Sequence, residues 1–109
     1  MPIANCFLAR ELEESDAQAI VATWAQRSGF DAAEMTVNVV KAKQGGNAYA
    51  VMAWLYLPSL WSEDDVMALG EGLAAALAEV MHIGASEVQV LTSIVTSGLV
   101  VEHGETLRW

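Results

Sequence analysis

Few side chains in this 109-residue sequence can carry chemistry, and Pro2 has the most specific potential among them. While Met1 is attached, the Pro2 nitrogen is an amide and cannot act as a base. Removal of Met1 would expose a free secondary amine. An ordinary α-amine titrates at about 7.7–8.0, and burial in an apolar pocket would lower that pKa. An amine with a pKa near neutrality could move a proton between carbon and oxygen of a small keto acid.

The other reactive residue types have structural explanations in this sequence. Cys6 is the only cysteine and stands at an apolar strand position, which indicates a core residue in a reducing compartment. His82 falls at the end of a predicted helix, where a cation favours the carbonyl end of the dipole. His103 lies in a predicted turn, and no third ligand of metal spacing accompanies it. We therefore expect neither a metal site nor a cofactor.

The first half of the sequence reads as strand, helix and strand. A strand is predicted over residues 2–9, and Ser15 with Gln18 has the pattern of a helix capping box. Gly29 is expected to end that helix in the left-handed conformation. A second strand is predicted over residues 35–40.

The second half repeats this order. A strand is predicted over residues 48–57, and Ser62 is expected to cap a helix that ends at Gly84. A further strand follows over residues 87–95, and residues 97–109 form a hairpin with its turn at His103 and Gly104. The sequence thus predicts one domain over 1–109, with pseudo-repeats 1–43 and 48–95.

Two consecutive βαβ units define an α+β fold. Each helix links two parallel strands, almost always with a right-handed crossover, so the units form a four-stranded mixed sheet with both helices on one face. In the 48–57 strand, Met52, Trp54 and Tyr56 alternate with residues that are also apolar. The sheet face without helices therefore needs a partner, and self-association is the expected solution.

Composition leads to the same expectation and excludes some partners. Hydrophobic residues make up 54% of the chain and the mean hydropathy is +0.34, which favours an oligomer for so small a domain. The net charge of −9 excludes nucleic acid and disfavours anionic membrane surfaces. No apolar run is long enough to cross a bilayer and no signal-peptide pattern is present, so a cytoplasmic location is expected.

The start Met1-Pro2-Ile3-Ala4 resembles the N-terminus of the tautomerase superfamily. The duplicated βαβ layout is similar to the longer members related to macrophage migration inhibitory factor. Residues 62–95 and 98–109 look closest to an uncharacterised bacterial branch of that superfamily. The resemblance implies that Met1 is removed and that the Pro2 amine is the catalytic base. It also implies a homotrimer whose sheets enclose a barrel, with the C-terminal hairpin reaching a neighbouring subunit.

Members of that superfamily use Arg or Lys to hold a substrate carboxylate. Arg10 lies near the position where compact members carry such an arginine, and Lys41, Lys43 and Arg108 are further candidates. This sequence departs from the pattern in two places. The strand over 35–40 lacks the arginine of some members, and residues 29–31 replace the lysine that others carry after the first helix.

The first functional hypothesis is a keto–enol tautomerase, an isomerase if Met1 is removed, that acts on a small α-keto or unsaturated acid through Pro2. The second is a trimeric member that retains the fold without the chemistry. The third is a ferredoxin-like module that shares the βαββαβ order, dimerises and binds a small effector. A trimer would favour the first two hypotheses, and a dimer would favour the third.

Overall fold

The computed structural model describes residues 1–109. The elements in chain order are β1 (Ile3–Leu8), α1 (Glu14–Ser28), η1 (Ala32–Glu34), β2 (Thr36–Lys41), β3 (Val51–Pro58), α2 (Glu63–Met81), η2 (Ala85–Glu87), β4 (Val88–Val95), β5 (Val100–Glu102) and β6 (Glu105–Leu107). The predicted strands, helices and C-terminal hairpin are all confirmed, with ends shifted by a few residues. The two 3-10 helices, η1 and η2, precede the second strand of each βαβ unit and were not predicted.

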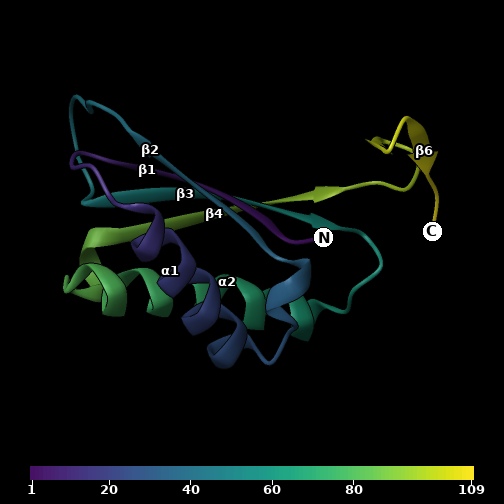
Figure 1. Ribbon diagram of the computed structural model, residues 1–109, viewed down its shortest axis with the longest axis horizontal. Coiled ribbons are helices and arrows are strands. Elements are labelled where there is room, and N and C mark those ends of the chain that lie inside the picture. The colour runs from purple at the N-terminus through teal and green to yellow at the C-terminus, as the bar shows by residue number, and fades with distance from the viewer.

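The four long strands form one mixed sheet in the order β2-β1-β3-β4. Strand β1 pairs in parallel with β2, β3 pairs in parallel with β4, and β1 and β3 run antiparallel at the centre. Both helices cover the same face of the sheet (Figure 1). The two strands of each βαβ unit are direct neighbours, whereas the ferredoxin-like fold splits them. The ferredoxin-like hypothesis is therefore wrong at the level of topology.

The core lies between the helices and the inner face of the sheet. Burial alternates along the two central strands, with every second residue facing the helices, as the period of a strand requires. The residues at 0% exposure include Ala4, Cys6, Val51, Leu55 and Leu57 from the strands, and Ile20, Trp24, Leu69, Leu73, Ala76 and Leu77 from the helices. No charged or polar side chain is buried in this layer.

The outer face of the sheet carries no helix. Its central pairs are Asn5 with Trp54 and Phe7 with Met52. The rings of Phe7 and Trp54 meet edge to face with centroids 4.9 Å apart, and Trp54 remains 40% exposed. Leu91 of β4, beside Trp54 in the register, is 44% exposed. This surface is the apolar, helix-free sheet face that the sequence predicts.

Two helix ends differ from the sequence prediction. Helix α1 begins two residues earlier than a Ser15 cap would place it, with Glu13 as its N-cap and the Glu13 amide donating to Asp16 Oδ2 at 3.1 Å. Helix α2 ends at Met81, because His82 takes the left-handed conformation (φ 56°) two residues before the helix end predicted at Gly84. The Ile83 amide then donates to the Ala78 carbonyl at 3.1 Å and closes the helix end. The Gly29 and Ser62 caps are confirmed.

The C-terminal hairpin forms its own two-stranded sheet, apart from the main one. His103 and Gly104 both have positive φ, 53° and 80°, as the tight turn of a two-residue hairpin requires. Figure 1 shows the hairpin extending beyond the end of the main sheet, on the side where the N-terminus lies. Trp109, which follows the hairpin strands, connects the hairpin to the segment after β3 by donating from Nε1 to Ser59 Oγ at 2.9 Å.

The two glycines within α2 are expected to respond differently to substitution. A Cβ on Gly72 would lie 3.1 Å from Ser28 Cβ and 3.2 Å from the Ser28 amide nitrogen of α1, whereas a Cβ on Gly70 would lie 3.8 Å from Thr92 Oγ1. We expect Gly72→Val to lower the free energy of unfolding by about 1–3 kcal/mol through overpacking. Gly70→Val is the matched control and should change it far less. Equal losses in urea unfolding would contradict close packing at Gly72.

Neither helix is long and apolar enough to span a membrane.

Candidate functional site

Pro2 lies directly before β1 and is fully buried. It continues the inward-facing series of Ala4 and Cys6, which places its ring toward the helix layer. The Thr36 amide donates to the Pro2 carbonyl at 3.0 Å, so the parallel pairing of β1 with β2 extends to this residue. Pro2 therefore has a fixed position at one end of the sheet.

A cavity of about 420 Å³ lies beside Pro2. Its lining includes Met1 and Ile3, the two chain neighbours of Pro2, together with Ala33, Glu34, Thr36 and Glu102. The Pro2 nitrogen is bonded to the Met1 carbonyl. Removal of Met1 would therefore expose that nitrogen to the space that Met1 now occupies.

Both ionisable side chains in this lining are carboxylic acids, from two distant parts of the chain. Glu34 ends the 3-10 helix η1, which Asp31 caps by accepting from the Ala33 amide at 2.9 Å. Glu102 ends β5, immediately before the hairpin turn. Neither residue was expected at the site from the sequence. No local pattern marks them, because only the hairpin's position relative to β1 and β2 brings them to one cavity.

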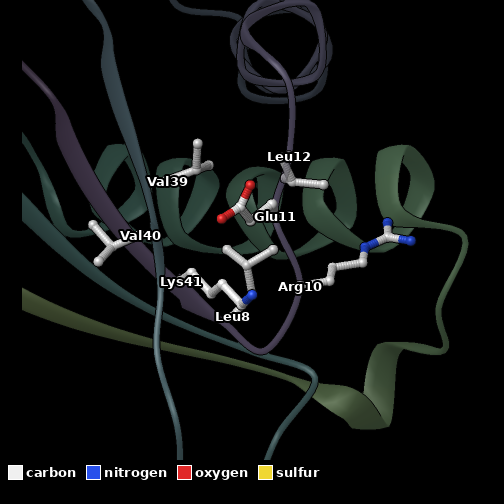
Figure 2. A pocket seen from close by; sticks show the side chains of 7 residues that line it. All are labelled: Leu8, Arg10, Glu11, Leu12, Val39, Val40 and Lys41. Carbon is white, nitrogen blue, oxygen red and sulfur yellow. The ribbon is translucent and has the colours of Figure 1, made fainter.

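Arg10 and Lys41 lie at the opposite end of the sheet from Pro2. Together with Leu8, Glu11, Leu12, Val39 and Val40, they line a smaller cavity of about 190 Å³ (Figure 2). Lys41 pairs with Leu8, six residues along β1 from Pro2, which corresponds to about 20 Å at the usual rise of a strand. One protomer therefore does not bring these two cations to the Pro2 cavity.

Arg10 already has a partner in the fold. Its Nη2 donates to the Met81 carbonyl at 3.2 Å, at the C-terminus of α2. In Figure 2 its side chain points away from the other labelled residues, toward the end of that helix. A cation in this position stabilises the helix terminus.

The remaining candidate cations lie apart from one another. Lys43 and Lys41 line a cavity of about 560 Å³ with Ala9, Ala42 and Gln44, at the same end of the sheet as Arg10. Arg108 follows β6, and a Cβ added to Gly98 (φ 91°) would lie 2.9 Å from its Nη1. Arg108 is thus the candidate cation on the hairpin that also supplies Glu102 to the Pro2 cavity.

No aromatic side chain lines the cavity beside Pro2. Ile3 lines the cavity, while Phe7 and Trp54 meet each other further along the outer face. Leu57 is buried in the core. The apolar environment of Pro2 is therefore the helix-covered interior and not an aromatic surface.

The remaining reactive side chains lie outside this cavity. Cys6 is buried in the central strand β1, and desolvation raises the pKa of its thiol to about 12, so it is a neutral thiol at physiological pH. His82 caps α2 and His103 lies in the hairpin turn. No group of three or more His, Cys, Asp and Glu side chains is placed to hold a metal ion.

Comparison with solved structures identifies the fold. The chain superposes on a fused 4-OT (4-oxalocrotonate tautomerase) described as a wild-type asymmetric trimer, with a TM-score of 0.79 at 13% identity, covering 95% of this chain and 94% of that one. It also matches Pt0534 inactivated by 2-oxo-3-pentynoate, with a TM-score of 0.76 at 16% identity and coverage of 96% and 94%.

A third match is macrophage migration inhibitory factor of Toxoplasma gondii, with a TM-score of 0.68 at 11% identity and coverage of 96% and 99%. No family model matches the sequence. No curated protein matches it either. The chain therefore has the tautomerase fold over nearly its whole length, and these identities establish the fold alone.

Proposed function

We propose that this protein, once Met1 is removed, is a keto–enol tautomerase in which the Pro2 amine is the general base. The observation that carries the proposal is the buried position of Pro2 between Met1 and Ile3, two residues that line a cavity, in a fold shared with tautomerases. The substrate class is a small α-keto or unsaturated acid.

The proposed chemistry is a proton transfer within one substrate. The neutral Pro2 amine takes the proton from the enol oxygen as the C=O bond forms. The resulting ammonium group returns a proton to the other carbon of the former C=C bond. No atom is gained or lost, so the reaction needs no cofactor. The buried ring disfavours the charged amine and thus lowers its pKa, which keeps a useful fraction in the basic form at neutral pH.

A substrate carboxylate requires a cation that one protomer does not supply at Pro2. We propose that Arg10 and Lys41 reach the cavity from a second copy of the chain, because their own protomer places them at the far end of the sheet. Arg108 is a third candidate, since it belongs to the projecting hairpin. Assembly would then be a condition for substrate binding as well as for stability.

We propose that the assembly is a homotrimer. Only 18 of 109 residues are buried in the isolated chain, and large apolar side chains remain exposed on the outer sheet face and on the hairpin, including Leu91, Leu99 at 74% and Val101 at 68%. Three of the similar structures are described as trimers. The native mass in solution tests this proposal, because a monomer or a dimer would contradict it.

A trimeric relative that retains the fold without catalysis is the second candidate. The cavity is lined by Glu34 and Glu102 and by none of the expected cations, which favours the non-catalytic candidate. The state of the Pro2 amine separates the two candidates, because a non-catalytic member has no need of a free, desolvated amine.

The test is a titration of the Pro2 nitrogen by ¹⁵N NMR in protein without a tag. We expect a free amine whose pKa lies below that of an ordinary N-terminal proline, because its ring is fully buried. The same sample should react at Pro2 with 2-oxo-3-pentynoate, the compound that inactivates the structurally similar Pt0534. Peptide mass spectrometry would locate the adduct.

Two results would contradict catalysis by Pro2. An amide signal would mean that Met1 is retained and that no base exists. An amine with an unshifted pKa and no adduct at Pro2 would favour the non-catalytic candidate.

A further inference from the structure

We infer that Glu34 and Glu102 exclude a second negative charge from the Pro2 cavity, so that the substrate is a monocarboxylate and not a dicarboxylate. This inference rests on the proposed function and narrows its substrate class. It names two specificity-determining residues, contributed by η1 and by the C-terminal hairpin.

The first step is the location of the two acids relative to the base. Both line the cavity that Met1 and Ile3 share, and no basic side chain lines it. The reacting carbon must come within about 3–3.5 Å of the Pro2 nitrogen. In a small diacid, both carboxylates lie only a few bonds from that carbon. The second carboxylate therefore comes close to the two glutamates even where partner-supplied cations bind the first.

The second step is the fixed position of the Glu34 backbone. The Asp31 side chain caps η1, and the Glu34 amide donates to the Asp31 carbonyl at 3.1 Å. The following Thr36 is bonded to Pro2 itself. The Glu34 backbone is therefore coupled to the strand that carries the base.

The third step is charge. The chain carries −9 overall, and neither glutamate has an ion-pair partner, since the one salt bridge joins Arg27 and Glu79. Both glutamates are solvent-exposed, so their repulsion is moderate and depends on ionic strength. Such charges at the rim of a site affect substrate selectivity and the rate of association more than the affinity of the complex.

The test compares turnover of two enols, phenylenolpyruvate as a monocarboxylate and the enol of oxaloacetate as a dicarboxylate. We expect the wild-type protein to prefer the monocarboxylate. In Glu34→Gln/Glu102→Gln, kcat/KM for the dicarboxylate should rise about tenfold at low salt, while that for the monocarboxylate changes less than about twofold. The gain should shrink toward 1 M salt, where the Debye length is about 3 Å.

A matched control removes the same charge elsewhere. Glu87 ends η2 as Glu34 ends η1, and Glu105 pairs with Glu102 across the hairpin. Neither Glu87 nor Glu105 lines the cavity. The variant Glu87→Gln/Glu105→Gln should therefore leave the preference between the two enols unchanged.

A second readout does not depend on turnover. Loss of two nearby negative charges should lower the pKa of the Pro2 amine in Glu34→Gln/Glu102→Gln, but not in the control variant. A lower pKa together with a gain for the dicarboxylate supports the inference.

Three results would overturn the inference. An unchanged preference in an active protein refutes the charge exclusion and leaves Pro2 catalysis standing. An equal gain in the control variant assigns the effect to net charge. Absence of turnover with an unshifted Pro2 amine refutes the proposed function, and the inference with it.

Discussion

Protein that retains Met1 is expected to have a kcat/KM about 10²–10⁴-fold lower than protein that begins at Pro2, the usual contribution of a general base. With Met1 attached, the Pro2 nitrogen has no lone pair available for a proton. The comparison changes one residue at the rim of the cavity and leaves the sheet and both helices intact. The two forms can be made from one cleavable N-terminal fusion, with or without Met1 after the cleavage site.

Pro2→Ala provides the control for this comparison. It retains a primary amine at the same place and loses the buried ring that fixes and desolvates it. Its activity should therefore lie between those of the two forms. Equal activity with and without Met1 would show that the Pro2 amine is not the base, whatever the effect of Pro2→Ala.

Trp24→Ala is expected to lower the free energy of unfolding by about 3–5 kcal/mol, the largest change for a single core substitution in this chain. Trp24 is at 0% exposure between the helices and the sheet. Its Nε1 also donates to the Leu69 carbonyl of α2 at 2.9 Å, so the side chain joins the two helices by packing and by a hydrogen bond. Truncation removes both contributions and leaves a cavity.

Urea unfolding measures this loss, and two further variants make it interpretable. Trp24→Phe retains a ring without the N–H donor and should cost about 1–3 kcal/mol, which keeps the test informative if Trp24→Ala does not fold. Trp109→Ala removes the same side chain from the exposed tail and should cost less. A Trp24→Ala loss no larger than that of Trp109→Ala would contradict the central position of Trp24.

The architecture could be predicted because the apolar patterns of the strands and of the helices indicate the same arrangement. The short continuous apolar run of β3 predicts a strand, and the apolar spacing of the helices fits the inner face of the same sheet. The helix ends were harder to place. Glu13 and Ser15 are both near an acidic first turn, and the amide of Glu13 finds Asp16 as its partner. His82 takes the left-handed conformation two residues before the helix end predicted at Gly84.

The site could be predicted only at Pro2, and the reason lies in chain direction. Pro2 precedes β1 and Arg10 follows it, so the two residues lie at opposite ends of one strand. The parallel partner β2 places Lys41 at the Arg10 end as well. By contrast, the proximity of Glu34 and Glu102 depends on where the hairpin projects, which no local pattern encodes.

The buried thiol of Cys6 gives this protein a native probe of how its core opens between the sheet and the helices. Cys6 lies in β1, hydrogen-bonded between β2 and β3, and no other cysteine competes with it. Because burial raises its pKa to about 12, the closed sheet presents almost no thiolate to a modifying reagent. Each labelling event therefore reports an opening that exposes the inner face of the sheet. Under conditions where reclosing outpaces labelling, the labelling rate measures the free energy of that local opening without any engineered residue.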